Sequence, residues 1–307
     1  MERRIGRRGL LAGVAAGLGA SLLEYESLAG RFDHRRARGA SSPARYASSL
    51  ESLESLDRAG GASVVHVGHS THLLSIGGLR ALTDPWFYDP AFGALSHEVA
   101  PAALPSEIGR LDLVLISHDH ADHADLRAMD EMDKRARVFV ATHDLAARIR
   151  KLGYREVTVL APWEEAREGA VTIAAVPALH DIYEIGFVVR GGGTSMYFAG
   201  DTRLHPDMAA IAERYAPDVA ILPVDGTRLI GGALHVMTPG DALTAARALE
   251  SKVVIPSHAE AVFSDVLVEQ VLASTVIGPK ELFARFVHDA LPGVRCVLPA
   301  PGELVTV

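Results

Sequence analysis

Short apolar runs rich in Val, Ile and Thr recur along the chain from Ala62 onward, and polar or glycine-rich stretches separate them. Such runs are typical of strands. Gly77-Gly78 and the three glycines at 191–193 each lie between two runs and predict hairpin turns. Strands are therefore expected at Ser63–Val67, Thr71–Ile76, Leu79–Thr83, Leu111–Ser117, Val138–Thr142, Glu156–Leu160, Val171–Ala175, Glu184–Arg190, Ser195–Ala199, Asp218–Val224, Lys252–Pro256 and Val294–Leu298.

Segments with helical character are interleaved with these strands. They are expected at Asp125–Lys134, Asp144–Leu152, Pro206–Tyr215, Pro239–Glu250 and Pro279–Ala290. The last three begin at a proline, which is favoured in the first turn of a helix. An α/β fold with two facing sheets and helices outside them accommodates this order.

The N-terminal part of the chain has a different pattern. Four arginines among the first eight residues precede the uncharged run Leu10–Leu23, which has the length of a signal-peptide core and is short for a membrane span. Arg7-Arg8-Gly9-Leu10-Leu11 resembles the twin-arginine export signal, and Ser27-Leu28-Ala29 offers a cleavage site. Residues 1–29 are interpreted as a signal peptide or N-terminal anchor. The protein is then exported to the periplasm or tethered to a membrane; an ordinary N-terminal helix and a cytoplasmic location are the alternative.

The remaining chain divides into a linker and one large domain. Residues 30–61 are polar, with leucines at 50, 53 and 56 that suit a short surface helix. Residues 62–307 are expected to form a single domain. A net charge of −8 provides no overall basic field for nucleic acid. Cys296 is the only cysteine, which excludes both an internal disulfide and a cysteine-based zinc site.

The string Ser117-His118-Asp119-His120-Ala121-Asp122-His123 directly follows an apolar strand. Side chains alternate along a strand, so His118, His120, Asp122 and His123 need a loop to converge. Imidazole and carboxylate groups together suit Zn, Mn or Fe. The spacing therefore predicts a metal site after this strand.

Three more ligand-type residues stand where an apolar run ends: His180, Asp201 and His258. Each alone is commonly a turn or capping residue. Functional side chains concentrate on loops held by rigid elements, so together with the His118 cluster these three complete a shell for two metal ions.

The set HxHxDH, a later His, Gly-Asp-Thr at 200–202 and a late His resembles the metallo-β-lactamase superfamily. Asp84 matches the early aspartate of that family. Gly68-His69-Ser70-Thr71, Thr83-Asp84-Pro85-Trp86-Phe87 and the string from His235 to Pro239 are similar to the branch with N-acyl-phosphatidylethanolamine phospholipase D and ascorbate-6-phosphate lactonase. The segments that follow His180 and His258 do not match either enzyme clearly. The resemblance covers Ala62 to the C-terminus and implies a four-layer αβ/βα sandwich.

The resemblance also assigns roles to the seven residues. His118, His120 and His180 would hold one metal ion, Asp122, His123 and His258 a second, and Asp201 would bridge both. Asp84 would orient ligands from behind. Two divalent ions, zinc or else Mn or Fe, would activate a hydroxide that attacks a phosphodiester, lactone or ester in a small-molecule or lipid-like substrate.

Two residues are expected to act on protons. Asp122 is placed to take the proton of the attacking water. His235 precedes a proline-started helix and is expected to stabilise a substrate oxyanion or protonate the leaving group, although a capping role near that helix is equally open. For His66, His69 and His72 packing is favoured, with His69 nearest the site.

The same residues bear on other activities known for this fold. A di-iron oxygen-reducing protein of this fold usually has Glu where His120 stands. A nuclease would be expected to carry added nucleic-acid-binding segments and a basic surface, and neither is visible. A non-catalytic binding module tends to lose ligands, whereas all seven are present. Amidase or lactamase activity stays an alternative.

Overall fold

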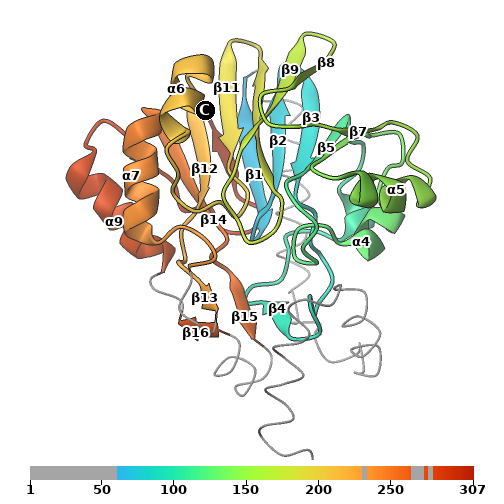
Figure 1. The fold of residues 1–307 in the computed structure, drawn as a ribbon, viewed down its shortest axis with the longest axis horizontal. Helices are drawn as coiled ribbons and strands as arrows, with labels where there is room; N and C mark the ends of the chain where they lie inside the picture. Colours follow the sequence, from blue (N-terminus) through green and yellow to red (C-terminus); the bar gives the residue numbers. More distant parts are fainter. Residues whose placement is uncertain (1–60, 230–233, 264–272, 276–278) are drawn as a thin grey trace, which may run out of the picture.

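The computed structural model describes residues 61–229, 234–263, 273–275 and 279–307. The expected signal or anchor segment, residues 1–29, and all but the last residue of the expected linker lie outside the described residues. The described chain contains two seven-stranded sheets that stack face to face, with helices on both outer sides (Figure 1).

The first sheet comes mainly from the N-terminal half of the domain. Its strand order is β18-β1-β2-β3-β5-β6-β7. The central hairpins are antiparallel, and β3, β5, β6 and β7 run parallel. The bounds are β1 (Ser63–Gly68), β2 (Thr71–Ile76), β3 (Leu79–Thr83), β5 (Leu113–Ile116), β6 (Arg137–Val140), β7 (Val157–Val159) and β18 (Leu304–Thr306). The edge strand β18 comes from near the C-terminus and pairs antiparallel with β1.

The second sheet comes from the C-terminal half. Its strand order is β17-β14-β12-β11-β10-β9-β8, parallel from β17 to β11 and antiparallel from β11 to β8. The bounds are β8 (Glu165–Glu168), β9 (Val171–Pro177), β10 (Ile185–Gly191), β11 (Thr194–Phe198), β12 (Val219–Pro223), β14 (Val253–Ser257) and β17 (Arg295–Cys296). The hairpin expected at residues 191–193 joins β10 to β11.

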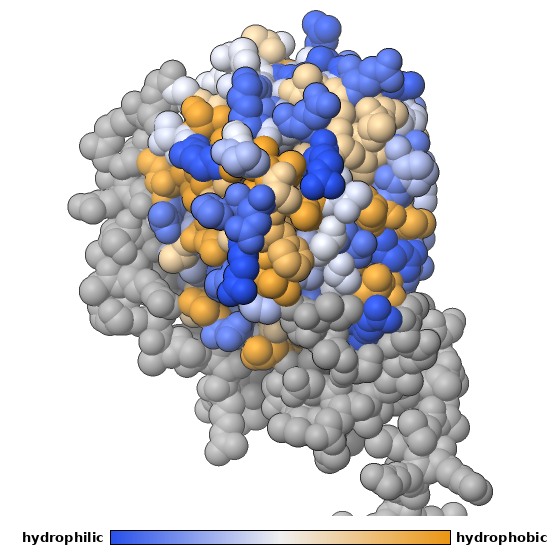
Figure 2. All heavy atoms as spheres, turned by 90° about the vertical axis from the view of Figure 1, so that its left-hand side faces the viewer, coloured by the Kyte–Doolittle hydropathy of each residue, from blue (hydrophilic) through white to orange (hydrophobic). Residues whose placement is uncertain are grey.

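Helices cover the two outer faces. One side carries α4 (Leu126–Glu131) and α5 (His143–Lys151); the other carries α6 (Met208–Tyr215), α7 (Pro239–Leu249) and α9 (Lys280–Ala290) (Figure 1). The face formed by α6, α7 and α9 mixes hydrophilic and hydrophobic side chains (Figure 2). None of the described helices is both long enough and apolar enough to cross a membrane.

Three hydrophobic cores separate the four layers. In β5, Val114 and Ile116 pack toward α4 and α5, whereas Leu113 and Leu115 pack between the sheets. The third core lies between the second sheet and α6, α7 and α9. Strands buried on both faces read as continuous apolar runs rather than as alternating ones. The expected four-layer αβ/βα sandwich is confirmed.

The expected strands and helices are present, but several bounds were wrong. The helix expected to reach Lys134 ends at Glu131, because Met132 takes an extended conformation. The helix expected from Pro206 begins at Met208, after Asp207. Short elements with little sequence signal were not foreseen. They are the edge strands β8 and β18, the 3-10 turn Pro105–Glu107, β4 (Leu95–His97), which pairs with β15 (Ala261–Phe263), and β13 (Arg228–Leu229), which pairs with β16 (Ala273–Thr275).

Candidate metal centre

All seven residues expected to ligate metal meet at one edge of the sandwich. Together with His69, they fall into two groups, and the potential ligand atoms within each group lie within 4.8 Å of one another. The first cluster is His118, His120, His180 and Asp201, and the second cluster is His69, Asp122, His123 and His258. Six of the predicted residues are buried, and His120 is half-buried.

The strand ends explain this convergence. The residues 118–123 follow β5 of the first sheet, while His180, Asp201 and His258 follow β9, β11 and β14 of the second. A tight turn closed by the amides of His123 and Ala124, which donate to the carbonyl of His120, folds the HxHxDH string back on itself. The centre therefore draws its side chains from both sheets.

Nitrogen atoms crowd together in the first cluster. His120 Nδ1 lies 2.9 Å from His118 Nε2 and 3.3 Å from His180 Nε2. Burial lowers the pKa of His118 and of His180 to about 4. Burial and the neighbouring His118 lower the pKa of His120 as well. Neutral imidazoles are the form that binds a metal ion.

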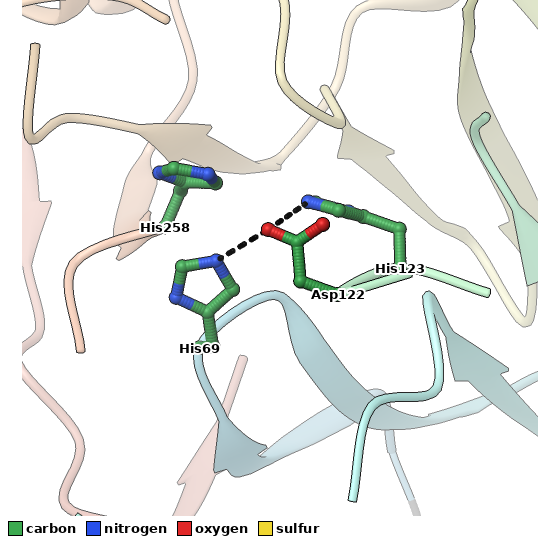
Figure 3. Close-up of side chains that lie close together, drawn as sticks. All are labelled: His69, Asp122, His123 and His258. Carbon is green, nitrogen blue, oxygen red and sulfur yellow. Dashed lines mark ion pairs between the residues drawn. The ribbon is translucent and has the colours of Figure 1, made fainter. Parts of the chain in front are cut away.

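His69 joins the second cluster, where the sequence predicted packing. It lies between β1 and β2 with a φ of 50°, and its Nε2 atom is 3.9 Å from Asp122 Oδ2. His69, Asp122, His123 and His258 point toward a common centre (Figure 3). The rings of His69 and His258 have centroids 4.3 Å apart. The sequence placed His69 nearest the site among the three histidines, but it did not predict His69 as a candidate ligand.

Asp201 of the first cluster also lies close to two residues of the second cluster. Its Oδ2 atom is 3.1 Å from His123 Nε2, 3.2 Å from His258 Nε2 and 3.9 Å from His118 Nε2. Burial opposes the charge of this carboxylate, but His123 and His258 hold the pKa of Asp201 well below its usual value. Conversely, burial disfavours protonation of His123 and His258, but the Asp201 carboxylate raises the pKa of both.

Three further buried carboxylates contact residues of the clusters and orient them. Asp84 Oδ2 accepts from His123 Nδ1 at 2.7 Å, as its expected orienting role requires. Asp225 Oδ2 lies 3.1 Å from His258 Nδ1. Glu184 accepts from the Asp201 amide at 2.6 Å and lies 3.1 Å from His118 Nδ1. Such partners fix which ring nitrogen faces the metal.

Buried polar atoms without hydrogen-bond partners indicate that the two clusters can bind metal ions. Buried polar atoms normally have hydrogen-bond partners, so a buried polar atom without one needs an explanation. Five such atoms among the described residues belong to the two clusters: His69 Nδ1, His69 Nε2, Asp122 Oδ1, His123 Nε2 and Asp201 Oδ1. Imidazole and carboxylate donors suit Zn, Mn or Fe. Because these cations would neutralise the buried Asp201, the clusters fit divalent metal ions.

His235 lies beside the first cluster. Its ring centroid is 4.5 Å from that of His180 and 5.8 Å from that of His120. His235 Nδ1 is hydrogen-bonded to Asp181, which also accepts from Arg203 at 2.8 Å. Arg203 in addition donates to the carbonyl of Leu234. Asp181 thus fixes one ring nitrogen of His235, and the other has no hydrogen-bond partner among the described residues.

His66 and His72 lie away from the clusters. They contact each other at 3.2 Å, and His66 Nε2 is 2.8 Å from Glu260 Oε2. Glu260 also accepts from Lys280 of α9. The packing and hydrogen-bonding role expected for His66 and His72 is therefore confirmed.

Comparisons with known proteins agree with this geometry. Residues 80–259 match the Beta-lactamase superfamily domain. A UPF0173 metal-dependent hydrolase of Hyperthermus butylicus is 30% identical over 253 residues, which are 78% of this chain and 96% of the relative. One of Thermofilum pendens is 33% identical over 201 residues, 63% of this chain and 81% of the relative.

A solved structure shares the fold over most of its length. Igni18, a metallo hydrolase from the hyperthermophilic archaeon Ignicoccus hospitalis, superposes with a TM-score of 0.62 at 25% identity. The match covers 80% of this chain and 98% of Igni18.

Proposed function

The chain belongs to the beta-lactamase superfamily and is a metal-dependent hydrolase of the UPF0173 family; we propose that it cleaves a phosphodiester, lactone or ester at a centre of two divalent metal ions. The position of Asp201 carries the proposal. Its buried carboxylate lies within 3.2 Å of both His123 and His258 and belongs to the first cluster. A carboxylate between two sets of ligands suits a pair of ions better than a single one.

Each ion has its own set of residues. His118, His120 and His180 would hold one ion, while Asp122, His123 and His258 would hold the other. Asp201 would contact both. Bound there, two divalent cations, zinc or else Mn or Fe, supply Lewis acidity that acidifies a water and polarises the attacked carbonyl or phosphoryl group.

Protons are handled by two side chains of the protein. Asp122 Oδ1 is buried without a hydrogen-bond partner among the described residues, so it is available to accept the proton of the attacking water. His235 Nδ1 donates to Asp181, so Nε2 donates to a substrate oxygen or to the leaving group when the ring carries its second proton. Both residues lie at the centre that would hold the substrate.

The choice of substrate rests on the likeness of Gly68–Thr71, Thr83–Phe87 and His235–Pro239 to phospholipase D and lactonase strings. The substrate is a small molecule or a lipid-like molecule. Amide hydrolysis is the alternative within the same chemistry. A binding module without catalysis is disfavoured, because all seven expected ligands meet in space.

Metal analysis combined with a hydrolysis panel tests the function. Purified full-length protein, reconstituted with Zn or Mn, is assayed with bis(4-nitrophenyl) phosphate, a γ-lactone, 4-nitrophenyl acetate and 4-nitroacetanilide. About two ions per chain and turnover of the phosphodiester, lactone or ester are expected. One ion per chain would overturn the paired centre, and turnover of the anilide alone would overturn the substrate class.

We also propose that the twin-arginine-like string at Arg7 and Arg8 directs export. That route carries folded proteins, so the metal centre would be loaded before export. Changing both arginines to lysine should retain the protein in the cytoplasm, as measured by cell fractionation. A wild-type protein found full length in the cytosol would contradict export.

A further inference from the structure

Phe92 has a backbone conformation that aromatic residues rarely adopt. Phe92 and Gly93 are the central residues of a turn, with φ values of 49° and 71°. The Ala94 amide donates to the Ala91 carbonyl at 3.0 Å and closes the turn. Positive φ at both central positions is the type I′ arrangement, which prefers Asn-Gly. Phe at the first of these positions is strained, and retained strain points to a function.

For the six other non-glycine residues with positive φ in the described chain, the structure shows what favours that conformation. Ala216 and Glu250 end α6 and α7 as left-handed caps. Trp163 packs on Tyr215 and lies 4.2 Å from the Arg214 guanidinium. The other three belong to the metal centre or its support: His69, Asp84 and His258.

The ring of Phe92 also faces the metal centre. It belongs to none of the three hydrophobic cores, and the side chain is half-buried. Its ring contacts His120 edge to face, with centroids 5.5 Å apart and an interplanar angle of 80°. The strained residue therefore places an aromatic side chain against a candidate metal ligand.

The turn is fixed by the strand that follows it and by the contacts of that strand. It leads into β4, which pairs with β15 just after His258. His97 of β4 stacks on Trp86 with centroids 3.6 Å apart and lies 2.8 Å from Asp89. Side chains on such fixed supports present reproducible contacts to a substrate.

Three exposed apolar side chains belong to segments that border the same centre. Among the described residues, five large hydrophobic side chains are exposed. Leu179 and Tyr183, 45% and 53% exposed, flank His180 in sequence, and Val262 lies on β15 beside the strand that follows Phe92. None of the five lies on α6, α7 or α9, the helices that cover the face in Figure 2. Isolated exposed apolar residues are ordinary, but several on the segments that border one site suit a nonpolar ligand.

We propose that Phe92 determines specificity by contacting a nonpolar group next to the reacting bond of the substrate, which is therefore an aryl or alkyl ester, phosphodiester or lactone rather than a wholly polar one. This inference rests on the proposed function, because it places the substrate at the metal centre. The contact compensates for the strain that Phe92 introduces into its turn.

Ligand binding tests the contact without requiring turnover. Calorimetry on the metal-loaded protein compares phenylphosphonate with methylphosphonate, which share an anionic head and differ in their nonpolar group. The wild type should bind phenylphosphonate about tenfold more tightly. Phe92→Asn should reduce that ratio to about twofold or less, and Phe92→Tyr should retain it. Metal content should be the same in all three proteins.

Thermal unfolding gives an independent readout. Phe92→Asn introduces the residue that the turn prefers, so it should raise the melting temperature by about 2–4 °C. Trp163→Asn is the matched control, since it makes the same change at another left-handed aromatic residue that packs on Tyr215 and Arg214. The control should lower the melting temperature and leave the phosphonate ratio unchanged.

The outcomes separate the two proposals. A wild type that binds the phosphonates equally or binds neither, a ratio that survives in Phe92→Asn, or a lower melting temperature in that variant would each overturn the role of Phe92. A ratio that collapses in Phe92→Asn, while the wild type hydrolyses no phosphodiester, lactone or ester, would support Phe92 and refute the proposed function.

Discussion

Asp84 and His123 form a buried pair in which the carboxylate sets the direction of the ring. Asp84 Oδ2 accepts from His123 Nδ1 at 2.7 Å, and the opposite ring nitrogen lies 3.1 Å from Asp201. The two oxygens of Asp84 also accept from the amide and the hydroxyl of Ser117, at 2.7 and 2.6 Å. One carboxylate therefore fixes both the ligand His123 and the start of the loop that carries His118.

Asp84→Asn should weaken metal binding without removing a ligand. The Asn side chain has one accepting oxygen where Asp has two, so it cannot accept all the hydrogen bonds that Ser117 and His123 donate to Asp84. A loss of about 10- to 100-fold in metal affinity is expected, with the fold retained. Competition with a metal chelator measures the affinity, and circular dichroism verifies the fold. Unchanged affinity would show that His123 is oriented by other groups.

Asp201→Asn should reduce metal content more than His258→Ala does. Asp201 is placed to contact both ions, so losing its charge weakens both sites, whereas His258 serves one. We expect no detectable turnover in Asp201→Asn and a residual ion with residual turnover in His258→Ala. Plasma emission spectrometry and the hydrolysis panel measure both. Two ions and near-normal turnover in Asp201→Asn would place the bridge elsewhere.

His235→Ala should lower the rate of hydrolysis most for substrates with the poorest leaving groups. A proton donor matters when the departing oxygen is basic, and contributes about 10²- to 10⁴-fold. A 4-nitrophenolate leaves without help, so 4-nitrophenyl esters should change little while alkyl esters lose most of their rate. Asp181→Asn should show the same dependence more weakly, since it removes only the partner of Nδ1. An equal loss on both leaving groups would assign His235 to binding or structure.

Glu260→Gln should destabilise the protein in a pH-dependent way. Burial alone would raise the pKa of Glu260, but hydrogen bonds from His66 and Lys280 lower it to about 2. The pKa is below the unfolded value of about 4.3, so the stabilisation is complete above that pH and disappears as the pH falls toward 2.

The cost of Glu260→Gln at pH 7 should be about 2–3 kcal/mol, because Lys280 and His66 lose a buried partner. Urea unfolding of the chelator-treated wild type and variant at pH 7 and pH 3 measures it. Chelation in both proteins removes any contribution from metal release. A difference in unfolding free energy that is the same at both pH values would contradict the ionic role of Glu260.

The ligand positions could be predicted because each follows an apolar strand at its C-terminal end, a local pattern visible in one sequence. His69 was harder to predict, since His66, His69 and His72 straddle a register shift between β1 and β2 that decides which ring turns toward the centre. Glu184 and Asp225 act on residues 17 and 33 positions away, Asp201 and His258, so only the folded chain reveals them. β18 is three residues long, and its pairing with β1 is equally non-local.

That pairing has a consequence for biosynthesis. β1 and β2 are made early and can form their hairpin on the ribosome, but the outer edge of β1 stays open until residues 304–306 have been synthesised. Pairing between distant segments is slow, and an unprotected edge can pair with another chain. The first sheet is therefore complete only after residues 304–306 have left the ribosome. A nascent chain stalled before residue 304 should be the form most dependent on chaperones.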